Sequence, residues 1–338
     1  MTLDPRRRQM FTSLRCAAGA AILLATTVQA QGLGALEREI GRLSGIAGGK
    51  LGVGIIHLET GRELHVNADQ PFPMASTFKV PVAVQLLRLV DQGRVRLDSM
   101  ITIRPQDLHP GSGTLSGLFD DPGVSLSLRN LLELMLLISD NSATDLVLTA
   151  AGGGPAVNAR LAELAVKGIS VDRPTILLIA DAIGIRSLPP EFEWSRAGFQ
   201  KLSAAVTEAE RDAARKGFLA DRRDTATPRG MAQLLAKIWK GETLSKTSTE
   251  LLIDIMFRCE TGALRIKGML PPGTRVAHKT GSLDLGIAND VGIVELPDGA
   301  GHVALAVFQK EATKGVEDQE RTIAQIARAV YDYFLLVR

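Results

Sequence analysis

Strand-like segments lie near both ends of this chain, and a long stretch with helical patterns separates them. Near the N-terminus, residues 50–59 have a strand-like pattern, and Thr60-Gly61 predicts a hairpin turn into a second strand at residues 62–66. Further strands are predicted near the C-terminus, at residues 274–278, 290–295 and 303–309. The two sets would have to share one sheet, so the helical stretch is predicted to be an insertion between them.

Most of the chain between and beyond these strands has the apolar spacing of amphipathic helices. Helices are predicted at residues 34–43, 76–90, 128–139, 153–167, 193–217 and 316–336. Thr227-Pro228 predicts the start of another helix, with Thr as the cap and Pro in the first position. Residues 168–192 are predicted to be irregular with apolar pieces.

The chain of 338 residues is therefore predicted to have an α/β fold with an all-α insert. A mixed, mainly antiparallel sheet would be flanked by helices, with a helical domain between the N- and C-terminal sheet segments. Residues 31–72 and 229–338 would form the sheet domain. Residues 73–228 would form the helical domain, which includes an extended loop at about residues 168–228.

Residues 1–30 are predicted to be an export signal peptide. Arg6-Arg7-Arg8 form a positive start, residues 17–28 are apolar, and Val28-Gln29-Ala30 is a small-residue cleavage site. The apolar run is too short to span a bilayer comfortably. The signal fits the Sec route and, loosely, the twin-arginine route, so the mature protein is expected to be periplasmic or secreted and not inserted in the membrane.

The charge and composition of the chain after residue 30 argue against nucleic-acid binding and against a metal site. The 39 basic and 37 acidic residues include four basic and one acidic in the leader, which leaves 35 and 36. This near-neutral chain has no basic stripe for nucleic acid, and aromatic residues make up only 4% of it. Its five histidines have no HxxxH or HxH spacing, so a metal hydrolase is not expected, and no cofactor is predicted.

Only two cysteines occur, Cys16 in the leader and Cys259. The mature chain is therefore predicted to have no internal disulfide. Cys259 is interpreted as a small core residue.

The first motif with chemical meaning is Ser76-Thr77-Phe78-Lys79. Residues three apart share a helix face, so the Ser76 hydroxyl and the Lys79 amine can meet. A serine hydroxyl becomes an effective nucleophile when a base takes its proton, and a lysine can serve if burial and a second cation lower its pKa. Such a pair alone is common on solvated helices, but the flanking apolar segments favour a buried helix start.

Two further motifs follow in order. Ser139-Asp140-Asn141 is either a polar helix cap or a proton-relaying hydroxyl with an amide that grips a substrate carbonyl. Lys279-Thr280-Gly281-Ser282 is either a strand running into a turn or a cation and hydroxyls for a substrate carboxylate. On an edge strand, the third motif would also leave a backbone N–H free for an oxyanion hole.

The three motifs behind an export signal resemble the serine β-lactamase and penicillin-binding-protein superfamily, most closely the class A β-lactamases. The resemblance covers nearly the whole mature chain and includes residues 223–228, which look like the end of the family's omega loop. It implies that Ser76 is the nucleophile acylated by a β-lactam. It further implies that Lys79 takes part in deprotonating Ser76 and that Ser139 passes a proton to the lactam nitrogen.

The resemblance also implies how substrate is bound. Asn141 would hold the acylamino side chain, and the motif Lys279-Thr280-Gly281-Ser282 would bind the substrate carboxylate. Backbone N–H groups of Ser76 and Ser282 would form the oxyanion hole. Arg265 is similar to an arginine that some members use for the carboxylate, and it could equally be an ordinary surface residue.

The chain departs from the family in the extended loop. A Glu-x-x-Leu-Asn pattern, which carries the family's deacylating glutamate, is absent between residues 168 and 228. Glu191 and Glu193 are candidates for the role and Asp181 is a weaker one, although each could be just a loop acid. Arg173 could pair with Asp224 to brace the loop.

The sequence therefore predicts a monomeric, class A-like serine β-lactamase that acts on a small-molecule β-lactam through an acyl-serine intermediate. The alternative is a D-Ala-D-Ala peptidase, an esterase-like hydrolase or a penicillin-binding protein that is acylated but releases the product slowly. A third possibility is a non-catalytic binding domain with the same fold, and the three intact motifs argue against it.

Overall fold

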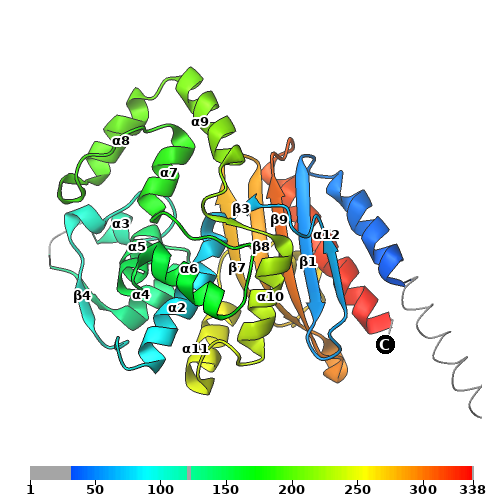
Figure 1. Ribbon diagram of the computed structural model, residues 1–338. Helices are drawn as coiled ribbons and strands as arrows, with labels where there is room; N and C mark the ends of the chain where they lie inside the picture. The colour runs from blue at the N-terminus through cyan, green and yellow to red at the C-terminus, as the bar shows by residue number, and fades with distance from the viewer. Residues whose placement is uncertain (1–31, 120–122, 337–338) are drawn as a thin grey trace, which may run out of the picture.

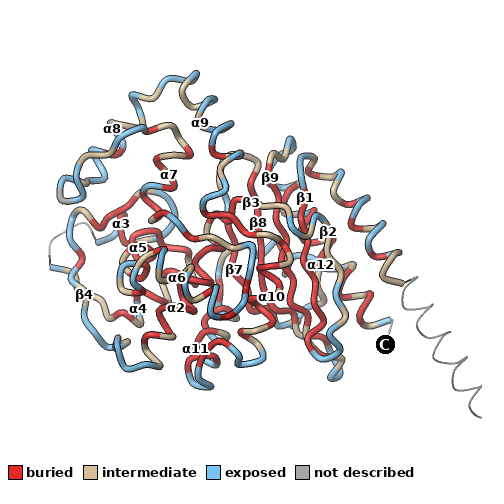
Figure 2. Tube along the Cα trace, viewed as in Figure 1, coloured by how far each residue is buried: buried red, intermediate tan, exposed pale blue. Residues whose placement is uncertain are grey.

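A computed structural model describes residues 32–119 and 123–336 of the chain. Its centre is a five-stranded sheet with helices on both faces, and a large helical part lies beside one edge (Figure 1). Buried positions concentrate in the sheet and in the helices next to it (Figure 2). The predicted signal peptide at residues 1–30 lies outside the described residues.

Both ends of the chain contribute strands to this sheet. Its order is β2-β1-β9-β8-β7, and each neighbouring pair is antiparallel. The strands are β1 (Lys50–His57), β2 (Glu63–Val66), β7 (Val276–Leu283), β8 (Ile287–Glu295) and β9 (His302–Lys310). Because β1 pairs with β9 from Lys50 opposite Lys310 to His57 opposite Val303, the prediction that both ends share one sheet is confirmed.

The sequence of β1 explains how helices cover both faces of the sheet. Its Val53 and Ile55 pack in one apolar cluster with α12 (Val316–Leu336) and the helix at residues 32–44. On the opposite face, a Cβ at Gly54 would lie 2.2 Å from the carbonyl oxygen of Pro228, the first residue of α10 (Pro228–Trp239). Glycine therefore lets α10 lie directly against the strand.

The helical part begins and ends at two short strands, β3 (Phe72–Pro73) and β6 (Thr225–Ala226), which pair with each other. Its central helix is α2 (Lys79–Asp91), in which ten of 13 residues are buried. The elements around α2 are η1 (Ala75–Phe78), β4 (Met100–Thr102), η2 (Pro105–Asp107), α3 (Leu115–Leu118), β5 (Ser125–Ser127), α4 (Leu128–Leu137), α5 (Asn141–Ala150) and α6 (Gly153–Glu163). Between α10 and the last strands lie α11 (Lys246–Phe257), η4 (Ile266–Met269) and η5 (Pro297–Gly299).

The prediction that residues 168–192 are irregular is wrong, because this segment contains helix α7 (Thr175–Ile183). The backbone N–H groups of Thr175 and Ile176 donate to the Asp145 carboxylate at 2.6 and 3.1 Å. Pro174, which precedes the helix, offers no side-chain oxygen as a cap. The cap of α7 thus comes from a distant helix, which local sequence patterns do not reveal.

The single helix predicted at residues 193–217 is also wrong. The segment forms α8 (Arg196–Ala205) and α9 (Glu208–Ala220), preceded by the short turn η3 (Glu191–Glu193). Thr207 caps α9, and the Glu210 carboxylate accepts a hydrogen bond from the backbone N–H of Thr207 in return. This Thr-x-x-Glu capping box is visible in the sequence and indicates the break between the two helices. Figure 1 shows α8 and α9 projecting from the body of the molecule.

Candidate active site

The first motif lies where the loop after β3 enters the core. Ser76 belongs to η1, and Lys79 is the first residue of α2, fully buried. Ala75 has a φ of +44°, a left-handed conformation that non-glycine residues adopt only at a cost of about 1–3 kcal/mol. Ser139 in the second motif has a φ of +62°. Both motif segments are therefore held in backbone conformations that the surrounding packing imposes.

The Ser139 hydroxyl connects two lysine amines that are far apart in the sequence. Lys79 Nζ donates to Ser139 Oγ at 3.0 Å, and Lys279 Nζ donates to the same oxygen at 3.0 Å. Lys79 Nζ also reaches the Ser139 carbonyl oxygen at 2.7 Å and Asn141 Oδ1 at 3.1 Å. One residue from each of the three motifs therefore meets at Ser139 Oγ.

Burial and mutual repulsion set the charge of these amines. Burial, together with the positive charge of Lys279, holds the pKa of Lys79 well below its ordinary value. Burial lowers the pKa of Lys279 to about 8, although the negative charges of Cys259 and Asp290 favour its protonated form. Lys279 is thus mostly protonated at neutral pH, and Lys79 loses its proton more readily than an ordinary lysine does.

The third motif comes close to the backbone of Ser76 because Gly281 has no side chain. It lies on β7, the edge strand of the sheet. A Cβ at Gly281 would stand 2.6 Å from the Met74 carbonyl oxygen and 2.9 Å from the Ser76 nitrogen. Asn289 of β8 fixes the same turn, because its Nδ2 donates to the carbonyl oxygens of Pro73 at 2.9 Å and Met74 at 3.0 Å. Asn289 is a positioning residue that sequence reasoning missed.

Arg265 is not an ordinary surface residue, because it is buried beside the third motif. Its guanidinium donates to Ser282 Oγ at 2.7 Å, to the carbonyl oxygens of Gly281 at 3.2 Å and Asn289 at 2.9 Å, and to Glu320 Oε1 at 3.1 Å. This arrangement places a cation directly behind the Ser282 hydroxyl.

Two polar side chains, those of Thr261 and Cys259, extend in a row of contacts from Thr280 of the third motif. Thr280 Oγ1 lies 2.6 Å from Thr261 Oγ1, which lies 3.3 Å from Cys259 Sγ. Burial raises the pKa of the Cys259 thiol, but His278 and Lys279 reverse the effect and bring that pKa to about 7. Cys259 is buried, as predicted, and it is polar in its contacts rather than a simple core residue.

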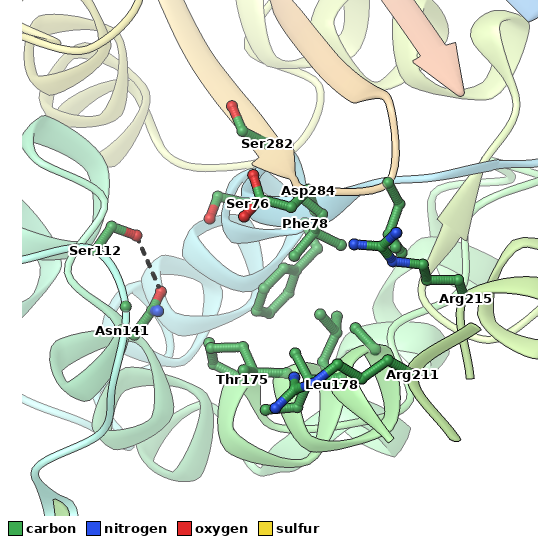
Figure 3. A pocket seen from close by; sticks show the side chains of 17 residues that line it. Ser76, Phe78, Ser112, Asn141, Thr175, Leu178, Arg211, Arg215, Ser282 and Asp284 are labelled. Carbon is green, nitrogen blue, oxygen red and sulfur yellow. Dashed lines mark hydrogen bonds between the residues drawn. The ribbon is translucent and has the colours of Figure 1, made fainter. Parts of the chain in front are cut away.

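Ser76, Asn141 and Ser282 line a cavity of about 390 Å³, which is the size of a small-molecule site (Figure 3). Lys79, Ser139 and Lys279 are buried and do not belong to this lining. The opposite wall comes from the extended loop, through Thr175, Leu178, Ile179, Ala182 and Ile183 of α7 and Arg211 and Arg215 of α9. Among the described residues of the lining, Asp284 is the only one with a carboxylate.

The acidic residues that the sequence offered for deacylation do not line this cavity. Glu191 lies 3.5 Å from Arg104, and Glu193 borders a separate apolar cavity beside Trp194. Asp181 pairs with Arg173.

The predicted brace of the loop is confirmed. Arg173 Nε donates to Asp224 Oδ2 at 2.6 Å, and both side chains are buried. Arg173 Nη1 also pairs with Asp181 and, at 3.2 Å, with Asp221. One buried cation thus ties both ends of the extended loop together.

Fold and site together are those of a serine hydrolase, with Ser76 on the cavity wall and two buried lysines joined by the Ser139 hydroxyl. Known enzymes are similar to this protein along most of its chain. The sequence profile of the beta-lactamase enzyme family matches residues 35–334. A beta-lactamase from Bacteroides uniformis is 31% identical in an alignment of 318 positions that covers 91% of this chain and 94% of that protein. Beta-lactamase VEB-1 from Pseudomonas aeruginosa is 29% identical over 85% of this chain and 86% of its own.

Solved structures agree with these sequence matches. The crystal structure of the TLA-1 extended spectrum beta-lactamase superposes with a TM-score of 0.73 at 29% identity, over 91% of this chain and all of that one. The chain therefore belongs to the beta-lactamase enzyme family, among the class A serine β-lactamases.

Proposed function

We propose that this enzyme hydrolyses the amide bond of β-lactams through an acyl intermediate on Ser76. Neutral Lys79 takes the proton of Ser76 as the hydroxyl attacks the lactam carbonyl. The Ser139 hydroxyl then passes a proton to the lactam nitrogen, and Lys79 replaces it. The observation that carries this proposal is the position of Ser139 Oγ, 3.0 Å from both lysine Nζ atoms.

In the same proposal, the third motif binds and polarises the substrate. The backbone N–H groups of Ser76 and Ser282 stabilise the developing oxyanion, since an edge strand and the adjacent turn can aim both at one oxygen. Protonated Lys279, with the hydroxyls of Thr280 and Ser282, binds the substrate carboxylate. Arg265 supports this charge through its 2.7 Å hydrogen bond to Ser282 Oγ. Asn141 holds the acylamino group at the cavity wall.

Release of the acyl group is proposed to be the slow step of the cycle. Water attacks an ester at a useful rate when a base activates it. The wall of α7 that faces Ser76 presents Thr175, Leu178 and Ile179 rather than a glutamate. A penicillin-binding protein that releases the acyl group very slowly is thus the second candidate function, and this carboxylate-poor wall is the observation that favours it.

Intact-protein mass spectrometry after exposure to benzylpenicillin tests both candidates. We expect the wild-type protein to gain one penicillin mass, and Ser76→Ala to gain none. Ser44→Ala, on the helix at residues 32–44, is the matched control and should still gain the mass. An adduct on Ser76→Ala would place the nucleophile elsewhere.

The lifetime of the adduct separates hydrolase from slow binder. Loss of the mass over time, with matching hydrolysis of nitrocefin, supports the hydrolase. An adduct that persists without nitrocefin turnover supports the penicillin-binding protein.

We also propose that the protein is exported by the signal at residues 1–30, resides in the periplasm or outside the cell, and is a monomer. Within residues 32–119 and 123–336, no helix has the length and apolar character to cross a membrane. The proposed division into a sheet domain (31–72 and 229–338) and a helical domain (73–228) is supported by the pairing of β3 with β6 at the junction.

A further inference from the structure

The extended loop brings two cations to the catalytic cavity. Arg211 and Arg215 are four residues apart on α9, so they share one face of that helix. Both line the cavity that holds Ser76. Figure 3 shows Arg215 on the side of the cavity away from Ser112 and Asn141, and Arg211 along the wall that carries Thr175 and Leu178.

These two arginines lack a neutralising partner. Other arginines of the loop, such as Arg173, Arg186 and Arg223, pair with carboxylates. In contrast, Arg215 has no hydrogen bond or ion pair with any residue in the described ranges, and Arg211 donates to the uncharged carbonyl oxygen of Ser203.

Asp284 does not neutralise the positive charge of Arg211 and Arg215. It is the only carboxylate on the described lining, and it forms no ion pair with either arginine. Two guanidinium groups and one carboxylate give the described lining of the cavity a net positive charge. Arginines are well suited to take an anion here, because the planar guanidinium can bind a carboxylate with two parallel hydrogen bonds.

The position of the pair indicates which part of a ligand would meet it. In the proposed function, on which this inference rests, Asn141 holds the acylamino group and the lactam carbonyl lies at Ser76. The acyl side chain then extends across the cavity, along the apolar wall of α7, toward α9. We propose that Arg211 and Arg215 form a subsite for an anionic group on that side chain, so that the extended loop selects β-lactams whose acyl side chain carries a carboxylate.

Two penicillins that differ by a single side-chain carboxylate test this subsite. Carbenicillin carries the carboxylate and benzylpenicillin lacks it. The readout is the ratio of their second-order rates of acylation of Ser76, followed by intact-protein mass spectrometry, which does not depend on the rate of release. The variants are Arg215→Gln and the double variant with Arg211→Gln. The control is Lys216→Gln, an exposed lysine on the same helix that does not line the cavity.

We expect the ratio of carbenicillin to benzylpenicillin to fall about tenfold in the double variant, as loss of charge-assisted hydrogen bonds to a partly exposed anion predicts. Lys216→Gln should keep the wild-type ratio. In the wild type, the ratio should also fall at about 0.5 M sodium chloride, because salt screens exposed charges, and this salt effect should vanish in the double variant.

An unchanged ratio in the double variant, with both penicillins still acylating Ser76, overturns the subsite and leaves the proposed function intact. No acylation of the wild type by either penicillin overturns the proposed function and the subsite with it. If Arg211→Gln disturbs folding, the single variant Arg215→Gln decides the question, because it removes no hydrogen bond within the described residues.

Discussion

Replacing Gly281 by Ala adds a methyl group where strand β7 comes closest to the turn of the nucleophile. The new Cβ would lie 2.6 Å from the Met74 carbonyl oxygen, 2.9 Å from the Ser76 nitrogen and 3.0 Å from the Thr77 nitrogen. All three are backbone atoms, so no side chain can rotate away. Since ordinary contact begins at 3.4 Å, strand and turn must separate by up to about 0.8 Å.

This displacement should slow acylation while leaving the protein folded. Overpacking of this kind destabilises a protein by about 1–3 kcal/mol. A shift approaching 1 Å between reacting groups can lower a rate roughly 10²-fold. The turn cannot follow the strand freely, because Asn289 holds Pro73 and Met74 to β8. We therefore expect a folded protein whose second-order acylation rate with benzylpenicillin falls by one to two orders of magnitude.

The assay combines intact-mass kinetics with thermal unfolding, and Gly41→Ala serves as the control. A Cβ at Gly41, in the helix at residues 32–44, meets no atom within 4 Å. This variant should acylate at the wild-type rate and gain up to about 1 kcal/mol in stability, because Ala favours a helix over Gly. Wild-type acylation by Gly281→Ala would refute the reasoning that close backbone approach positions the nucleophile.

Three further predictions concern the charged groups of the site and loop. Ser139→Ala should keep the fold and lower the acylation rate about 10²–10⁴-fold, the usual contribution of a positioned proton donor, as measured by intact-mass kinetics. Because the pKa of Lys279 in the folded protein is about 8, its positive charge is present below that pH and lost above it. The affinity for the substrate carboxylate should therefore weaken as the pH rises through 8. A pH-independent affinity would contradict this role. Arg173→Met leaves Asp181, Asp221 and Asp224 without their shared cation and should lower the free energy of unfolding by about 3–5 kcal/mol in urea titrations. A stability loss below 1 kcal/mol would show that the loop does not need this brace.

Patterns that depend on near neighbours could be predicted from the sequence. The closing helix at residues 316–336 has the predicted bounds, because its apolar stripe repeats without interruption against the sheet. Thr227 caps α10 as predicted, since its hydroxyl accepts a hydrogen bond from the backbone N–H of Gly230, three residues on. The three motifs could also be found in the sequence, and each had both a structural and a functional interpretation.

Only the tertiary structure shows that the three motifs lie together. Lys79 and Lys279 are 200 residues apart, and only the packing of β7 against η1 and of α2 against α4 and α5 brings both amines to Ser139 Oγ. Their lowered pKa values follow from burial, which sequence spacing does not measure.

The extended loop likewise has features that the sequence shows and contacts that only the tertiary structure shows. Its unusual length and missing Glu-x-x-Leu-Asn pattern were plain in the sequence. That Asp145 caps α7, and that Arg211 and Arg215 face the cavity, depends on how two helices lie against distant elements. Contacts between residues far apart in the chain are set by the packing of the whole core, and no local pattern encodes them.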